Sequence, residues 1–448
     1  MLGQRNAGWL NQRAAALAAA GFAILALTPL STADAAPPSP YVFAGTETQL
    51  TPGPQNGTPG VVAIGDLHST THVQNTVNAI HCNYGSGLPA QPGCRNDIAV
   101  IGEQGYGEVF LRDAEDSGLT GGNFDSQNFL RPNPTTAGIA DFNGDGINDV
   151  AISAPTSDVV EVDYGLGHGQ FGNDQQIPIA FPGMDASLNY VSALAVGNLG
   201  NGHPDIVAVV SGATLGGDLD YGEMVVLMNN GQGQFTQTDY PTGLVPVSVA
   251  IGNLGNGRPD IAVASSGLGN QATDPGVNLF MNNGHGIFTA EPLVAAAAGT
   301  FPYGVGIGDF NGDGRPDLVT ANQNVDNSGS VTVLLSNGHG YTQQVIQDQE
   351  AFSGTEFDGY GGIAADDLNG DGRSDFAIAN FNANSMTVFM STHSASGLTF
   401  TQTTLPTDGL PDQIAIGHVN SSNGAQDIVV GDQRGDADLF TNTTPQVR

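Results

Sequence analysis

Short apolar runs separated by polar turns fill most of the chain beyond residue 60. One representative stretch holds four such runs in succession, at 247–252, 260–265, 277–282 and 286–289. Each run is shorter than an ordinary helix and is bounded by Gly, Asn, Asp or Pro, which favours β-strands. Asn283-Gly284 stands between the third and fourth runs, and this dipeptide is a strong signal for a β-hairpin. The pattern predicts an all-β chain built from antiparallel hairpins.

This four-strand unit recurs along the chain. Each copy opens with a run of small residues that ends near Asp, Asn or His, and the copies start near 61, 138, 195, 250, 306, 363 and 415. The spacing is about 51 to 58 residues, except for the first, which is about 75 because it holds an insertion bracketed by Cys82 and Cys94. Four strands at a fixed period are typical of a β-propeller blade, and small residues suit its innermost strand. We therefore expect a seven-bladed β-propeller of four-stranded antiparallel blades.

The two ends of the repeat region predict how such a ring would close. The last unit stops after a third strand at 437–441, and the N-terminal segment 43–52 resembles the fourth strand at 400–406. We predict that the N-terminal strand completes the last blade, which would pair two otherwise exposed strand edges. Residues 36–448 would then form a single domain.

Three units carry the same nine-residue pattern, Asp-x-Asn-Gly-Asp-Gly-x-x-Asp, directly after their first strand. We call these the first loop (141–149), the second loop (309–317) and the third loop (367–375). Oxygen side chains stand at positions 1, 3, 5 and 9, the carbonyl at position 7 can add another ligand, and Gly at position 6 permits the sharp turn. A hard cation such as Ca²⁺ takes six to eight oxygens. Strands flank the loops and no Glu stands at position 12, so they are not EF-hands.

We therefore predict about three bound Ca²⁺ ions, one for each loop. The alternative is an Asn/Asp/Gly turn that holds no ion. The predicted ligands, with position 7 acting through its carbonyl, are Asp141, Asn143, Asp145, Ile147 and Asp149; Asp309, Asn311, Asp313, Arg315 and Asp317; and Asp367, Asn369, Asp371, Arg373 and Asp375.

The order of strand, Asp/Asn/Gly loop and strand at this period resembles the FG-GAP/VCBS repeat family. Over roughly residues 41–448 the chain is similar to the seven-bladed propeller of integrin α-subunits, and the resemblance implies Ca²⁺ in the second, fifth and sixth blades. The loops at 198–205 and 253–260 are one residue shorter, and each keeps a single carboxylate, Asp205 or Asp260. We expect these to be metal-free turns held by Asn side chains. We also expect no ion in the first and seventh blades.

Charge and the N-terminal segment indicate export. The formal net charge is −34, and the ten basic residues are all Arg, so there is no basic patch for nucleic acid or anionic membranes. Arg5 and Arg13 precede an apolar run at 14–30, and Ala33-Asp34-Ala35 follows it. This order predicts a signal peptide over residues 1–35 and a secreted or cell-surface protein without membrane insertion. In an oxidising compartment Cys82 and Cys94 should form a disulfide.

These features favour a calcium-binding adhesion or ligand-binding module, expected to be a monomer, whose ligand is a surface protein or a glycan. Nucleophile-elbow, P-loop and H-E-x-x-H motifs are missing from the sequence, so we expect no catalysis. The alternatives are an extracellular lyase or hydrolase of polysaccharides, with a site at the mouth of the axis, and a matrix protein that self-associates with calcium. Arg434-Gly435-Asp436 spells an adhesive tripeptide but is a single short match. Candidate ligand-binding loops lie at 266–276, 322–330, 358–362 and 381–385.

Overall fold

The structure is a computed structural model that describes sixteen stretches of the chain, and all of them belong to one unit, Val42–Arg448. The described residues are 48–50, 61–65, 97–101, 107–112, 119–123, 136–153, 159–167, 170–179, 190–213, 219–267, 275–325, 328–348, 362–394, 397–419, 425–432 and 437–443. The predicted signal peptide, Cys82, Cys94 and Arg434-Gly435-Asp436 lie outside them. No helix within these stretches has the length and apolar character needed to cross a membrane.

The described strands form six four-stranded antiparallel sheets and one sheet with a fifth strand. The first three sheets in chain order are β2 (Val61–Gly65), β3 (Asp97–Ile101), β4 (Gly107–Arg112) and β5 (Leu119–Asn123); β6 (Thr136–Ala140), β7 (Asp149–Ser153), β8 (Val159–Gly167) and β9 (Gln170–Pro178); and β10 (Tyr190–Gly197), β11 (Asp205–Ala213), β12 (Leu219–Asn229) and β13 (Phe235–Pro241).

The later sheets follow the same order. They are β14 (Pro246–Gly252), β15 (Asp260–Ser265), β16 (Gly276–Asn282), β17 (Phe288–Ala290) and β18 (Val294–Ala295); β19 (Thr300–Gly308), β20 (Asp317–Asn324), β21 (Gly329–Ser336) and β22 (Tyr341–Asp348); β23 (Ile363–Asp366), β24 (Asp375–Asn380), β25 (Ser385–Ser394) and β26 (Gly397–Pro406), with the 3₁₀ helix η2 (Phe381–Ala383) between β24 and β25; and β27 (Pro411–Gly417), β28 (Asp427–Asp432), β29 (Ala437–Phe440) and β1 (Thr48–Leu50).

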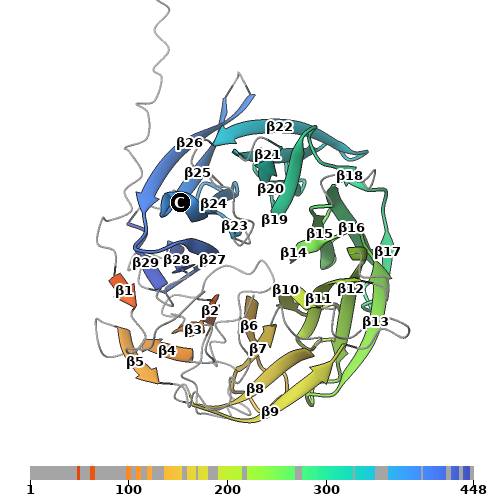
Figure 1. The fold of residues 1–448 in the computed structure, drawn as a ribbon, viewed down its shortest axis with the longest axis vertical. Coiled ribbons are helices and arrows are strands. Elements are labelled where there is room, and N and C mark those ends of the chain that lie inside the picture. The colour runs from red at the N-terminus through yellow and green to blue at the C-terminus, as the bar shows by residue number, and fades with distance from the viewer. Residues whose placement is uncertain are drawn as a thin grey trace, which may run out of the picture. The chain divides into compact units, whose positions relative to one another are not determined.

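The sheets surround a common axis, with the first strand of each innermost (Figure 1). Each first strand contacts the first strand of the next sheet, and β27 contacts β2. The predicted N-terminal pairing is confirmed, because β1 runs antiparallel to β29 with Gln49 opposite Asp438. The fold is therefore a β-propeller of four-stranded antiparallel blades.

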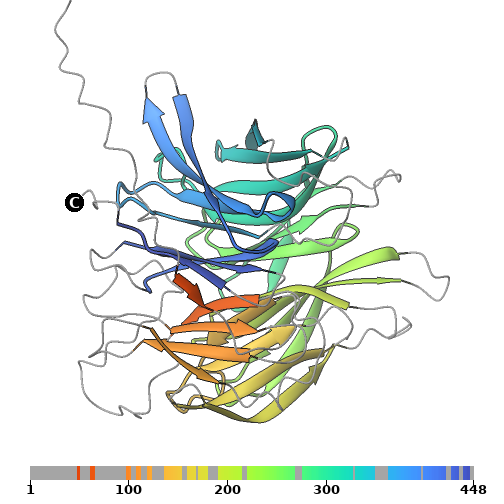
Figure 2. The ribbon, with the colours of Figure 1, turned by 60° about the vertical axis from the view of Figure 1, so that its left-hand side comes forward.

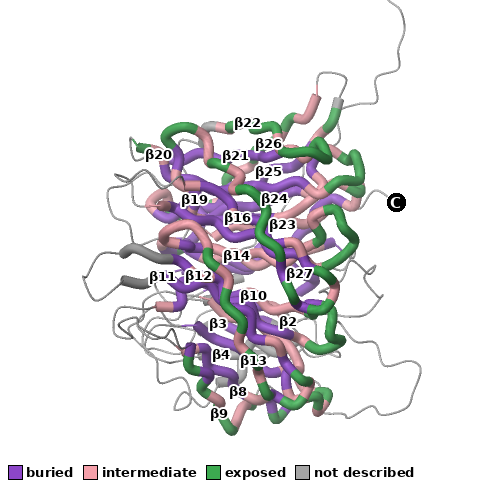
Figure 3. The backbone as a smooth tube through the Cα atoms, turned by 90° about the vertical axis from the view of Figure 1, so that its right-hand side faces the viewer, coloured by how far each residue is buried: buried purple, intermediate pink, exposed green. Residues whose placement is uncertain are grey.

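The core lies between neighbouring sheets, which pack face to face (Figure 2). On β11, Ile206, Ala208 and Val210 pack in the cluster that holds residues of β8. The alternate residues Val207 and Val209 pack in the cluster that holds residues of β15. Because both faces of such a strand are covered, its sequence is an unbroken apolar run rather than an alternating one. The outermost strands, such as β13 and β22, carry the exposed residues (Figure 3).

Glycine lets the innermost strands approach each other closely around the axis. A Cβ atom added to Gly252 would lie 3.0 Å from Cδ1 of Ile307 in the next sheet, and one added to Gly417 would lie 3.0 Å from Cγ2 of Ile64. The Ile of one first strand thus packs on the Gly of the preceding first strand. This contact explains why the small-residue runs end in Ile-Gly or a similar pair.

Candidate metal-binding loops

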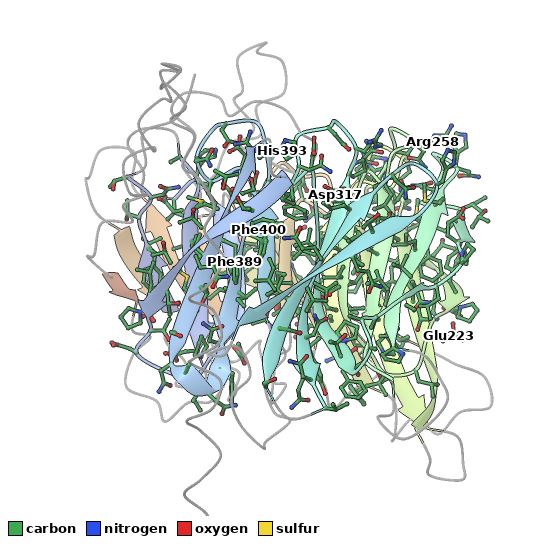
Figure 4. All side chains as sticks on the ribbon, turned by 90° about the horizontal axis from the view of Figure 1, so that it is seen from above. Glu223, Arg258, Asp317, Phe389, His393 and Phe400 are labelled. Atoms are coloured by element: carbon green, nitrogen blue, oxygen red, sulfur yellow. The ribbon has the colours of Figure 1, made fainter. Side chains whose placement is uncertain are left out.

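The three nine-residue loops join the first and second strands of their sheets and lie on one side of the propeller, which we call the loop face. Figure 4 places Arg258, from the short loop at the same position of its sheet, and His393, near the turn between β25 and β26, toward the same edge. Glu223 of β12 lies toward the opposite edge. All three loops therefore belong to one surface, as a shared position in the repeat requires.

In the first loop, side-chain oxygens are held by the backbone of the loop itself. Asp141 Oδ1 accepts the N–H of Gly144 at 2.7 Å, and its Oδ2 accepts that of Gly146 at 2.9 Å. Asn143 Oδ1 accepts the N–H of Asp145 at 2.8 Å. These short-range bonds shape the turn and bring positions 1, 3 and 5 together. The second and third loops repeat them through Asp309, Asn311, Asp313, Asp367, Asn369 and Asp371.

The aspartate at position 9 has a different task. Asp149 is fully buried, and its Oδ2 accepts the N–H of Phe142 at 2.7 Å while its Oδ1 accepts the N–H of Gly165 in β8 at 2.8 Å. One carboxylate therefore ties the start of the loop to the third strand of the sheet. The same pair of bonds is made by Asp317 with Phe310 and Ser336, and by Asp375 with Leu368 and Ser391.

Sheets whose loops lack the other carboxylates keep this aspartate. Asp205 accepts the N–H groups of Leu199 and Asn229, at 2.9 and 2.7 Å. Its counterparts in two further sheets make the same bonds, Asp260 with Leu254 and Asn282, and Asp427 with Val419 and Asn442. Position 9 is thus first a structural link, a role that sequence reasoning missed by treating it only as an ion ligand.

The short loops place an amide donor next to that carboxylate. Asn201 Nδ2 donates to Asp205 Oδ1 at 2.7 Å and to the Asn229 carbonyl at 2.9 Å. Asn198 Oδ1 accepts the N–H groups of Gly200 and Gly202, the part that Asp141 plays in the first loop. The Asn side-chain hydrogen bonds predicted for these turns are therefore present. Asn253, Asn256 and Asp260 repeat the arrangement in the next sheet.

Burial and repulsion between carboxylates raise the pKa values of the position-9 aspartates in the full loops. Burial raises the pKa of Asp149 to about 7, and the charges of Asp141 and Asp145 add to the shift although two backbone bonds oppose it. The pKa of Asp375 rises to about 7 and that of Asp317 to about 6, again mainly by burial. The loops therefore concentrate negative charge that the surrounding backbone compensates only in part.

Two of the loops supply a positive side chain of their own. Arg315 pairs with Asp313 at 2.6 Å in the second loop, and Arg373 pairs with Asp371 in the third. The first loop has Ile147 at this position, and Asp145 instead accepts a bond from the Asn143 amide at 3.1 Å. The nine residues of the first loop thus contain no cationic group.

The donor set of each loop is one that Ca²⁺ takes in proteins: three carboxylates, an amide oxygen and a backbone carbonyl. Across the described stretches, no three Asp, Glu, His or Cys side chains converge as a ready metal cluster. The loop oxygens are instead directed at backbone N–H groups, as in Asp141 and Asn143. The chemistry fits a hard cation, and the backbone bonds already bring the ligand positions to one turn.

Amide side chains also bind neighbouring sheets together across the loop face. Asn229, at the end of β12, donates through Nδ2 to the carbonyl of Phe142 in the first loop at 2.8 Å. Asn442 donates in the same way to Leu368 of the third loop at 2.7 Å. The sequence predicts only turns for such Asn-rich segments. The hydrogen bonds that join neighbouring sheets through these amides were not predicted.

Two segments of the chain match models of the FG-GAP repeat. Residues 133–172, which contain the first loop, match the FG-GAP repeat, and residues 254–320, which contain the second loop, match the FG-GAP-like repeat. No protein with a curated description matches the sequence.

Several solved structures resemble the chain. BBS1N in complex with ARL6DN has 11% identity and a TM-score of 0.48, over 81% of this chain and 96% of that one. An Agrocybe aegerita lectin that recognises non-reducing terminal N-acetylglucosamine has 19% identity and a TM-score of 0.47, over 78% and 81%. YCF48 from Cyanidioschyzon merolae has 13% identity and a TM-score of 0.46, over 88% and 98%.

The matched repeats coincide with structural units. The segment 133–172 covers β6, β7 and most of the following hairpin, and the segment 254–320 runs from the loop before β15 to the loop before β20 and just beyond. Repeat models and blades therefore describe the same strand–loop–strand unit, and the chain contains FG-GAP repeats that form blades of a β-propeller.

Proposed function

We propose that the protein is a secreted, calcium-binding, seven-bladed β-propeller that acts as a non-catalytic ligand-binding or adhesion module. The count of seven blades is supported by the five-stranded sheet, because β17 and β18 pair with successive parts of β16. They act as one interrupted outer strand, so this sheet is a four-stranded blade as well. Closure is supported by the β27–β2 contact and by the pairing of β1 with β29.

The observation that carries the calcium proposal is the contrast between full and short loops. In the first loop, burial and then the charges of Asp141 and Asp145 raise the pKa of Asp149, and none of the nine residues is cationic. In the short loops two of the three carboxylates are replaced and the Asn201 amide donates to the remaining one. The ion would neutralise the carboxylates and lock the hairpin, which makes its role structural.

Ligand binding is assigned to the face opposite the loop face. The loop face is occupied by turns that bond to one another and to neighbouring sheets, as with Asn229 and Phe142. The opposite face carries connections that differ from sheet to sheet, such as η2 between β24 and β25 and the Asn324–Ser328 contact between β20 and β21. Variable loops on a rigid scaffold are the usual place for recognition of a protein or a glycan.

Metal counting on the mature chain tests the calcium proposal. We expect about three Ca²⁺ per chain, with a lower melting temperature and faster amide exchange in the three loops after chelation. Mg²⁺ is the control, because it demands a smaller octahedral site and should not replace Ca²⁺ at equal concentration. A chain that holds no calcium, with a melting curve indifferent to chelator, would show that the loops are only turns.

Export and ligand binding need separate tests. Expression with the native N-terminus should yield a secreted chain that begins after Ala35, with Cys82 and Cys94 joined in a disulfide that peptide mapping detects. The calcium-loaded protein should then bind members of a glycan array or a panel of surface proteins, and substitutions on the opposite face should abolish that binding. Turnover of a polysaccharide by the purified chain would contradict the non-catalytic assignment.

A further inference from the structure

We propose that the second and third loops bind calcium as a coupled pair, whereas the first loop binds independently. This inference rests on the calcium proposal above and adds a positioning residue, Ser374, that transmits the state of the third loop to the second. It concerns how the ions influence one another, which the ligand pattern alone does not determine.

Ser374 forms a two-way link between the two loops. Its backbone N–H donates to the carbonyl of Asp309 at 2.9 Å, and its Oγ accepts the N–H of Asp309 at 3.2 Å. A Cβ atom on Gly308 would lie 2.5 Å from Cβ of Ser374, so the contact depends on that glycine. Asp309 is the first ligand position of the second loop. Ser374 stands between Arg373 and Asp375, the last two ligand positions of the third loop.

The residue at the same place in three other sheets cannot make the backbone half of this link. Position 8 is proline at Pro204, Pro259 and Pro316, and proline has no backbone N–H to donate. In the third loop the eighth residue bonds to the preceding full loop, whereas Pro316 keeps the second loop from making the backbone bond. Gln426, in the following sheet, reaches back in a related way to Asp366, at 2.6 Å.

The second loop also lacks the amide clamp that holds the other two. Phe142 in the first loop receives Asn229, and Leu368 in the third loop receives Asn442. At the corresponding place beside the second loop stands Ser391, whose buried Oγ makes no hydrogen bond. The second loop is thus anchored to its neighbour mainly through the third loop. The stem of Arg373 strengthens the contact, since a Cβ atom on Gly312 would lie 3.1 Å from its Cγ.

The position of Ser374 couples calcium binding in the third loop to calcium binding in the second. An ion in the third loop restrains the Arg373 carbonyl and Asp375, and the residue between them can then no longer shift. Its N–H and Oγ hold the backbone of Asp309 in place, so the second ion meets a loop that is already partly ordered. Two sheets with short loops separate the first loop from the second, and among the described residues no bond like those of Ser374 joins the two loops directly.

Calorimetric calcium titration of the full mature chain tests the coupling. The first loop is silenced with Asp145→Ala in every variant, so that the heat comes from the second and third loops only. Silencing the third loop with Asp371→Ala should weaken binding at the second by roughly fivefold or more. By reciprocity, silencing the second loop with Asp313→Ala should weaken the third by the same factor.

Ser374→Pro is the matched variant, because it makes 372–375 identical to the Gly-Arg-Pro-Asp of 314–317. In this background, silencing either loop should change binding at the other by less than about twofold. Asn148→Pro, at the same position of the first loop, is the control and should leave the coupling intact. Ser374→Ala keeps the N–H and should retain part of the coupling, which guards against misfolding of the proline variant.

Amide exchange in 309–316 provides a second measurement. With the second loop silenced by Asp313→Ala, added calcium should still slow exchange there through the third loop, and Ser374→Pro should abolish that protection. Equal affinity of the second loop with and without a working third loop would overturn the coupling while leaving the calcium sites in place. Absence of any bound calcium would instead overturn the calcium proposal, and the coupling with it.

Discussion

Replacing Asp205 tests whether position 9 is a structural link independent of calcium. Its carboxylate accepts two backbone N–H groups, from Leu199 and Asn229, and one amide bond from Asn201, all between 2.7 and 2.9 Å. Asp205→Ala removes all three acceptor contacts at once. The two backbone donors would then be buried without partners, because both ends of the link lie inside the fold.

The expected loss of stability follows from the two buried N–H groups that lose their acceptor. Each buried unsatisfied N–H costs about 1–3 kcal/mol, so the bonds lost amount to about 2–6 kcal/mol. Part of this is regained, since burial raises the pKa of Asp205 and so makes the ionised carboxylate itself costly. We expect a net loss of about 3 kcal/mol for Asp205→Ala. Asp205→Asn, which keeps one acceptor oxygen, should lose about half as much.

Urea unfolding followed by circular dichroism measures the change, with calcium and with chelator. Asp239→Ala is the control, because Asp239 is exposed on β13 and accepts an exposed side-chain bond from Gln237, so the stability lost on its replacement should stay within about 0.5 kcal/mol. The stability lost in Asp205→Ala should be the same in both media, because the short loop has a single carboxylate and is expected to bind no calcium. A loss below about 0.5 kcal/mol, or one that appears only with calcium, would refute the structural role.

Three further outcomes follow from individual residues. Asp145→Ala should lower the calcium count by one ion per chain in metal analysis, since the first loop loses a carboxylate ligand. Burial, with repulsion from neighbouring carboxylates, raises the pKa of Asp163 to about 8, above its ordinary 3.8. The native state therefore loses stability as the pH rises between these values, and Asp163→Asn should melt higher than wild type by an amount that grows from about pH 5 to pH 8. Gly138→Ala would place a Cβ atom 2.4 Å from Cγ2 of Val196 and should cost about 1–3 kcal/mol in chemical unfolding, most of which Val196→Ala should restore in the double variant.

Features that recur in the repeats were predictable, because the same residue pattern could be compared between several copies. The strands predicted at 247–252, 260–265 and 277–282 match β14, β15 and β16 to within a residue. The N-terminal strand was also predictable, because the last unit lacks a fourth strand and a segment near residue 48 resembles the fourth strand of another unit. Both predictions rest on local residue types and their spacing. These identify a strand whether one or both of its faces are buried.

Contacts between repeats were not predictable in the same way. Asn229 and Asn442 belong to turn-like segments, and nothing in their neighbours shows that their amides reach loops more than seventy residues away in the chain. Such bonds depend on how adjacent sheets are set around the axis, which no single repeat encodes. The sequence does show that Ser374 differs from three other repeats, which have proline at that position. Its role became clear only from its distance to Asp309.

Position 9 links these observations. If its aspartate served only the ion, it should have disappeared with the other ligands in the short loops, yet Asp205 and Asp260 remain and make the same backbone bonds as Asp149. The link between loop and third strand is therefore needed in each sheet for which these bonds are described, with or without a full set of oxygens. It follows that the proposed calcium ion would add to a hairpin that is already closed by hydrogen bonds. Chelation should accordingly loosen the three full loops and lower the melting temperature without dissolving the propeller, because the links that hold each sheet do not leave with the ion.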